Sequence, residues 1–128
     1  ARPRVLLTGF GPFPGAAENS SAWLVEELAG DRQSYLGCDL HAEVLPTEWA
    51  EVARLGPGLV QHHRPRLTLH LGLHKRAQGF RIERSAHNLI DLREDARGAV
   101  LDRCTILDRS DRRLDTAIPA TQLARHLR

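Results

Sequence analysis

The stretch that decides the fold is RVLLTGFGPFPG, residues 4–15, near the start of the chain. Its apolar first part, Arg4–Phe10, is closed by a glycine and is typical of a buried strand. The Gly- and Pro-rich part after it predicts a loop. Residues 19–21 (NSS) can cap a helix that Gly30 would end. A strand, a loop and a helix in this order begin an α/β fold.

The rest of the chain continues this alternation. Further strands are expected at residues 40–46, 67–73, 80–89 and 99–107. A helix is expected from an N-cap at Thr47 to residue 63, with a break at residues 56–58 (GPG), and a last one from residue 118 onward. The β-α-β-α-β order with short connections predicts a mostly parallel sheet with helices on both faces. Ligands of such sheets bind at the carboxyl ends of the strands, here the loops 9–19 and 72–79.

The composition excludes several classes of protein. A chain of 128 residues, 41% hydrophobic and 27% charged, suits one folded domain, residues 1–128, and not a disordered or fibrous chain. No apolar run approaches the roughly 18 residues of a membrane span. The 18 Lys and Arg residues are interspersed with 16 Asp and Glu residues, which argues against a nucleic-acid partner. We therefore expect a soluble, cytoplasmic α/β domain without a membrane segment.

The loop after the first strand invites a phosphate-binding interpretation, which its chemistry disfavours. A phosphate cradle needs consecutive backbone N–H donors, and Pro12 and Pro14 have none. The loop instead presents two aromatic rings, those of Phe10 and Phe13. These rings could form an apolar slot for a flat ligand, or they could fill the core, and the spacing does not decide between the two.

The histidines and cysteines do not show the spacing of a metal site. His70 and His74 are four residues apart but fall in a strand and a loop, and the pair at 62–63 ends a helix, where a cation favours the helix dipole. Cys38 and Cys104 are too few for a disulfide framework, and neither lies at a strand-to-helix turn that would expose a thiolate. Structural roles are the expected ones for all of these side chains.

Glu83 is the carboxylate that stands out, within FRIERSAHN at residues 80–88. It could pair with Arg81, Arg84 or another Arg as part of the structure, or it could orient a catalytic histidine. The sequence alone favours the ion pair.

Several segments, taken in order, resemble the pyroglutamyl peptidase I (pyrrolidone-carboxylate peptidase) family of cytoplasmic cysteine peptidases. The matching segments are LLTGFGPFPG followed by Asn19 and Ser21, VLPT at 44–47, LTLHLG at 67–72, Ile82-Glu83-Arg84 with Ala86 and Asn88, and Ile118-Pro119. The resemblance implies an α/β fold of the phosphorylase/hydrolase-like type, a three-layer α/β/α sandwich with a mostly parallel, twisted sheet.

The resemblance also implies site residues and a reaction. Phe10 and Phe13 match the aromatic pair that holds the pyrrolidone ring, and Thr47 matches a residue at the edge of that pocket. Glu83 matches the acid of a Cys-His-Glu triad, and Arg93 falls where the family has an arginine close to the active site. The implied reaction is removal of N-terminal pyroglutamate from peptides by acyl transfer through a thiolate, without cofactor or metal.

Some positions depart from the family pattern. The family commonly has a Gln and a Gly-Gly-Arg turn where this chain has Leu73 and then Lys-Arg-Ala at 75–77, and Glu94 replaces an apolar residue. Neither Cys38 nor Cys104 aligns with the family's nucleophile, and no histidine takes the role of its base. We therefore expect the chain to be incomplete at its C-terminus and inactive alone.

Two other functions are kept beside the peptidase. One is a non-catalytic small-ligand or interaction domain derived from the same family, for which the changed residues after the third strand would mark a changed ligand. A nucleotide-binding domain comes third. Assembly into a homo-oligomer is left open.

Overall fold

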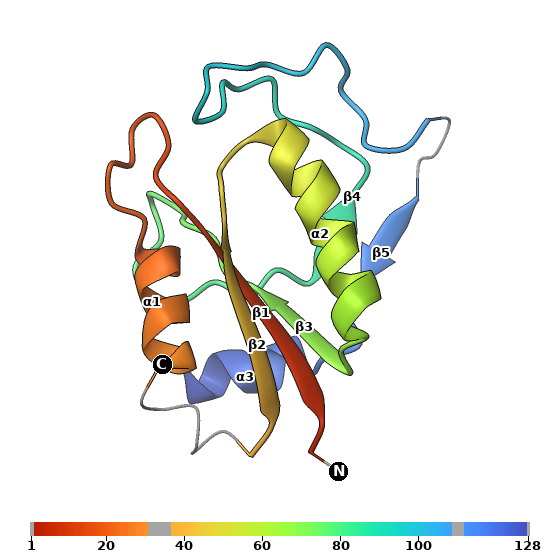
Figure 1. Cartoon of the computed structure of the whole chain (residues 1–128). Helices are drawn as coiled ribbons and strands as arrows, with labels where there is room; N and C mark the ends of the chain where they lie inside the picture. Colours follow the sequence, from red (N-terminus) through yellow and green to blue (C-terminus); the bar gives the residue numbers. More distant parts are fainter. Residues whose placement is uncertain (1, 31–36, 109–111, 128) are drawn as a thin grey trace. The chain divides into compact units, whose positions relative to one another are not determined.

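The computed structural model of the chain describes residues 2–30, 37–108 and 112–127 (Figure 1). The elements in chain order are β1 (Arg4–Phe10), α1 (Ser20–Ala29), β2 (Asp39–Leu45), α2 (Trp49–His63), β3 (Leu67–His70), β4 (Ser85–His87), β5 (Arg113–Asp115) and α3 (Ala120–His126). They belong to two compact units. The first consists of Ala1–Leu73 and Arg93–Val100, and the second of His74–Leu92 and Leu101–Arg128.

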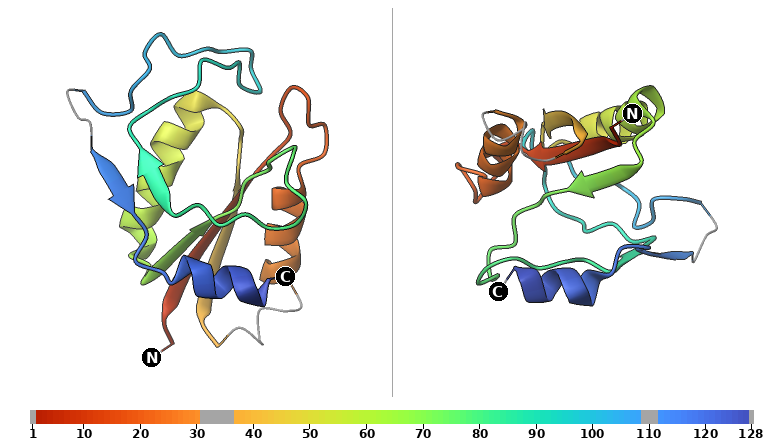
Figure 2. Two further views of the ribbon diagram at one scale, coloured as in Figure 1. Left: turned by 180° about the vertical axis from the view of Figure 1, so that it is seen from behind. Right: turned by 90° about the horizontal axis from the view of Figure 1, so that it is seen from below.

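The first unit is built on a parallel sheet with the strand order β2-β1-β3. Leu7 of β1 lies opposite Ala42 of β2 on one side and Leu69 of β3 on the other. Helices α1 and α2 lie against opposite faces of this sheet (Figure 2). The predicted α/β fold with a parallel sheet is confirmed.

The core of this unit follows from the apolar run in β1. Four consecutive residues, 6–9, are buried, because the central strand is covered on both faces. Leu7 packs with Val25 of α1 and Leu40 of β2 in an apolar cluster. Phe10 is the last residue of the strand and comes directly after this buried run.

The ends of β1, α1 and β2 agree with the sequence prediction to within about a residue, whereas β3 ends at His70 and not at residue 73. Asn19 is the N-cap of α1 and Gly30 its C-cap, as expected. Helix α2 begins at Trp49, after Glu48 rather than after an N-cap at Thr47, and it runs through Pro57 without a break. The expected interruption at residues 56–58 was wrong.

The second unit contains a short antiparallel pair, with Ser85 opposite Asp115 and His87 opposite Arg113. The strand expected at 80–89 is reduced to the three residues of β4, and 99–107 forms no strand. A side chain takes the place of a strand partner there. The Asn88 Oδ1 atom accepts the backbone N–H groups of Ile106 and Leu107 at 2.7 and 2.8 Å. The predicted last helix is confirmed as α3.

In the described part of the chain, no helix combines the length and apolar character needed to cross a bilayer.

Candidate functional site

The loop after β1 is held against the start of α1. The Ser21 hydroxyl accepts the Phe10 backbone N–H at 2.9 Å, and the Asn19 side-chain amide donates to the Gly11 carbonyl at 3.1 Å. The other end of the Asn19 side chain caps the helix by accepting the Ser21 N–H at 3.1 Å. The residue that caps α1 thus also fixes the backbone next to Phe10.

Phe13 is positioned by a turn of its own. Its backbone N–H and carbonyl exchange hydrogen bonds with Ala16 at 3.1 and 2.8 Å, and Gly15 supplies the positive φ of 88° that the turn needs. Both Phe10 and Phe13 are half-buried. Rings in this position, at the carboxyl end of the central strand, remain candidates for a flat-ligand slot.

Thr47 connects two loops of the first unit. Its hydroxyl donates to the Gly11 carbonyl at 2.8 Å, and its own carbonyl accepts the Ala96 N–H at 2.7 Å. The side chain expected to cap α2 is therefore used to hold the loop that carries the two phenylalanines.

Arg93 lies three residues before Ala96, in the segment that is bonded to Thr47. Its side chain is exposed, while its backbone carbonyl accepts the indole N–H of Trp49 at 3.0 Å. The structure thus ties the backbone of Phe10, Thr47 and Arg93 into one hydrogen-bonded region of the first unit, at the carboxyl end of β1 and β2.

Glu83 belongs to the second unit. It lies in irregular backbone two residues before β4 and is exposed. Among the described residues, Glu83 shows no ion pair with Arg81 or Arg84. The Arg81 guanidinium instead contacts the His74 ring at 2.8 Å. The role of Glu83 stays a prediction.

Asp95 is the residue that the sequence analysis missed. It is buried, although its neighbours from 91 to 94 and from 96 to 100 are exposed. Its carboxylate accepts the backbone N–H groups of Trp49, Arg97 and Ala99, each at 2.9 Å. An Asp followed by Arg-Gly two and three residues later is a turn signal that could have pointed to it.

The pKa of Asp95 is set by opposing effects. Burial taken alone raises the pKa, because it disfavours the charged carboxylate. The hydrogen bonds from Trp49, Ala99 and Arg97, with the Arg97 charge, outweigh burial and lower the pKa below its ordinary value. The ionised carboxylate is thus the form that the fold uses.

The cysteines occupy unlike environments. Cys38 is half-buried and packs against the Leu7 cluster, whereas Cys104 is exposed in irregular backbone of the second unit. The structure shows no base beside either thiol among the interactions of the described residues. The expected structural role of Cys38 agrees with this packing.

The histidines form pair contacts. His70 shares a 2.6 Å hydrogen bond with the buried Thr8 hydroxyl, and desolvation lowers the pKa of His70. His41 of β2 stacks on His63 of α2 with ring centroids 4.2 Å apart. Among the described residues, no three His, Cys, Asp or Glu side chains gather closely enough to hold a metal ion.

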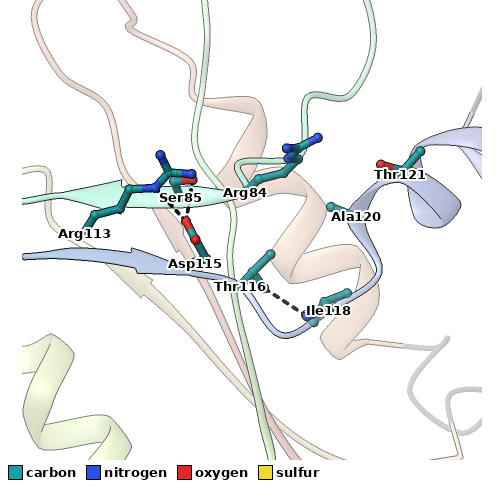
Figure 3. A pocket seen from close by; sticks show the side chains of 8 residues that line it. All are labelled: Arg84, Ser85, Arg113, Asp115, Thr116, Ile118, Ala120 and Thr121. Atoms are coloured by element: carbon teal, nitrogen blue, oxygen red, sulfur yellow. Dashed lines mark hydrogen bonds and ion pairs between the residues drawn. The ribbon is translucent and has the colours of Figure 1, made fainter.

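Each unit also has a shallow cavity. That of the first unit, about 270 Å³, lies between β2 and α2 and is lined by His41, Leu59 and His63 among others. That of the second, about 230 Å³, surrounds Asp115, whose carboxylate accepts from Arg113 and from Ser85 at 2.8 Å each (Figure 3). These bonds, the Arg113 bond most, lower the pKa of Asp115. None of the predicted site residues lines either cavity.

Comparison with known proteins gives one consistent result. Residues 3–127 match the family described as Pyroglutamyl peptidase. Pyroglutamyl-peptidase 1 of Rattus norvegicus is 38% identical over 91 residues, which cover 68% of this chain and 41% of that protein. Pyrrolidone-carboxylate peptidase of Gloeobacter violaceus is 43% identical over 91 residues, which cover 70% of this chain and 43% of that protein. The matched part of the chain thus spans less than half the length of these relatives.

Solved structures show the same likeness. The pyrrolidone carboxyl peptidase of Fervidobacterium islandicum AW-1 superposes with a TM-score of 0.89 at 29% identity, covering 98% of this chain and 60% of that one. The pyroglutamyl peptidase I of Bacillus amyloliquefaciens superposes with a TM-score of 0.77 at 25% identity, covering 97% and 60%.

Proposed function

This chain belongs to the pyroglutamyl peptidase family, and from that premise we propose that it carries the substrate pocket of a cytoplasmic cysteine exopeptidase that removes N-terminal pyroglutamate from peptides. Phe10 and Phe13 would hold the two faces of the pyrrolidone ring, with Thr47 at the edge of the pocket. Arg93 would lie beside it. The proposed substrates are peptides that begin with pyroglutamate.

The observation that carries this proposal is the hydrogen bonding of Thr47. Its hydroxyl binds the Gly11 carbonyl, next to Phe10, and its carbonyl binds Ala96, three residues from Arg93. Residues assigned to the pocket by resemblance alone are therefore tied together by contacts that the resemblance did not supply.

The proposed reaction is acyl transfer. A thiolate attacks the pyroglutamyl carbonyl, and backbone donors stabilise the resulting oxyanion. The C–N bond then breaks, the peptide amine leaves with a proton from the protonated base, and water hydrolyses the thioester to release pyroglutamate and restore the thiol. Glu83 would orient the imidazole of the base and stabilise its charged form. Neither Cys38 nor Cys104 is assigned as the nucleophile, so the nucleophile and base would come from outside these residues.

The proposal extends to the architecture. We expect the 128 residues to act as one α/β domain within a three-layer α/β/α sandwich, as the family resemblance implies.

The pocket is tested by equilibrium binding of L-pyroglutamyl amide to the ¹⁵N-labelled chain. We expect chemical-shift changes at Phe10, Phe13 and Thr47, and weaker binding of L-prolinamide, which lacks the ring carbonyl. Phe13→Ala should weaken binding about tenfold, because one face of the slot is lost. Phe80→Ala is the control, since Phe80 is a largely exposed ring of the second unit. Equal binding by both variants would remove Phe13 from the pocket.

A non-catalytic ligand-binding domain is the second candidate, favoured by the environments of Cys38 and Cys104 described above. Both candidates predict binding of a small ring. Only the peptidase predicts that Glu83→Gln lowers turnover in an active parent protein, by about a hundredfold or more, because the amide cannot stabilise an imidazolium. Unchanged turnover would leave Glu83 a structural residue.

A further inference from the structure

The loop that carries Arg93 is held to the start of α2 at three points. The Asp95 carboxylate accepts the Trp49 backbone N–H at 2.9 Å. The Trp49 indole N–H donates to the Arg93 carbonyl at 3.0 Å, and the Ala96 N–H donates to the Thr47 carbonyl at 2.7 Å. All three bonds join the loop to residues 47–49, so neither segment can shift without breaking them.

Asp95 also closes the loop on itself. Its carboxylate accepts from Arg97 and Ala99, its own N–H donates to the Ala99 carbonyl at 2.9 Å, and its carbonyl accepts from Gly98 at 3.0 Å. Gly98 has a φ of 78°, the conformation that lets the chain turn back. A loop whose other side chains are exposed thus gains a defined shape from one buried carboxylate.

The same carboxylate replaces a missing helix cap. Glu48 is the N-cap of α2 by position, and its side chain makes no capping bond. Asp95, distant in sequence, accepts the N–H of the first helical residue, Trp49, and places a negative charge at the positive end of a 15-residue helix. The helix and the Arg93 loop therefore stabilise each other.

We propose that Asp95 is a positioning residue that fixes Arg93 and Thr47 relative to the Phe10–Phe13 loop. It touches no ligand in this arrangement, and it acts through the Trp49 backbone, the Ala99 turn and the Arg93 carbonyl. The effect on ligand binding rests on the proposed function, whereas the effect on Arg93 does not.

The test uses Asp95→Asn, with Asp102→Asn as the matched control because Asp102 is an exposed carboxylate in irregular backbone. The Asn side chain keeps one acceptor oxygen, but its NH₂ group replaces the other. That NH₂ group would face a backbone N–H group, which cannot accept a hydrogen bond. We expect the Trp49 indole resonance to move, the Trp23 indole to stay, and the amides of Trp49 and Ala99 to exchange faster. The Asp102→Asn spectrum should match the wild type at all these sites.

Ligand binding supplies the second readout. Asp95→Asn should weaken binding of L-pyroglutamyl amide about tenfold, because a loop that is no longer held by these bonds must be ordered when the ligand binds. Thr47→Val lacks the hydroxyl that binds the Gly11 carbonyl and should also weaken binding. A folded Asp95→Asn protein with an unmoved Trp49 indole would overturn the positioning role, and so would a moved indole with unchanged affinity. If the wild type binds no amide at all, the proposed function fails, and the indole and exchange data alone decide the role of Asp95.

Discussion

Gly9 lies where α1 crosses the end of β1, and the contact leaves no room for a side chain. A Cβ atom built there would come 2.7 Å from the Ser21 carbonyl oxygen and 2.8 Å from a Val25 methyl group. Gly9→Ala should therefore lower the free energy of unfolding by about 1–3 kcal/mol, since helix backbone and core must both shift. Urea denaturation followed by circular dichroism measures this.

Gly58 provides the opposite case. It lies within α2, and nothing is within 4 Å of a Cβ built on it. Gly58→Ala should raise the free energy of unfolding by about 0.5–1 kcal/mol, because glycine costs a helix conformational entropy. If both substitutions lowered the free energy of unfolding equally, the close contact at Gly9 would not explain the effect there.

Acidification acts on the protein through His63. Burial lowers the pKa of His63, and the charges of His41, His62 and Arg4 lower it further against the opposing effect of Glu43. The unfolded chain then binds a proton near pH 6.5 that the folded chain does not yet bind. Stability should be full above that pH and fall as pH decreases through it toward the lower folded pKa. His70, whose pKa desolvation lowers, adds in the same direction.

The check is the urea midpoint measured between pH 8 and pH 5. In the wild type the midpoint should decrease over this range, and in His63→Gln the decrease should be smaller. Asp95 and Asp115 do not interfere, because both have lowered carboxyl pKa values and lose their contribution only below about pH 4. A wild-type midpoint that rises on acidification would contradict the assigned direction.

Among the elements, α1 shows what one cap contributes. Asn19 accepts the Ser21 N–H and hydroxyl, and donates to the Gly11 carbonyl. Asn19→Ala should cost about 1–2 kcal/mol of unfolding free energy. Asn19→Asp keeps the cap and loses only the donor to Gly11, whose carbonyl still accepts from Thr47, so its cost should be smaller. Thermal unfolding of the three proteins orders them, and an Asp variant less stable than the Ala variant would contradict the capping role.

How far the sequence predicts an element depends on whether its residues enter the core. β1, α1 and β2 supply Leu7, Val25 and Leu40, and their apolar patterns located them well. β5 consists of exposed residues, Arg113–Asp115, so no pattern marked it. The segment 99–107, expected to be a strand, has the N–H groups of its last two residues bonded to the Asn88 side chain instead of to a neighbouring strand. Local residue type says little where packing is absent.

Helix α2 shows the opposite error. Pro57 and two glycines predicted an interruption, since proline removes one helical hydrogen bond. Tertiary contacts decide instead. Before Pro57, Trp49 is hydrogen-bonded to Asp95 and to the Arg93 carbonyl. After it, Leu59 and His63 line a cavity with residues of β1 and β2, so both halves of the helix are held. The propensity of a short Gly-Pro-Gly segment was a weak guide.

At the scale of the whole molecule, the candidate site was predictable only where a motif named its residues. The loop itself pointed to Phe10 and Phe13 without deciding between a slot and the core, and only the family resemblance pointed to Thr47 and Arg93. Asp95 did not, because its partner Trp49 lies 46 residues away in sequence and an Asp in a charged loop resembles any solvated carboxylate. The residues after Asp95 signal a turn, but nothing near it in the sequence signals the contact with Trp49.

Activity of the chain by itself would depend on its two thiols. Acyl transfer needs an ionised thiol beside a base, and losing the nucleophile removes the covalent route. Cys38 is packed against the Leu7 cluster, and Cys104 is exposed in irregular backbone, so neither has the setting of an activated thiolate. The 128-residue chain should release no more fluorophore from a pyroglutamyl coumarin amide than buffer does. Cys38→Ala and Cys104→Ser should change nothing, while the chain still binds L-pyroglutamyl amide. Hydrolysis that either substitution abolishes would place the nucleophile within these residues and overturn the assignment of roles.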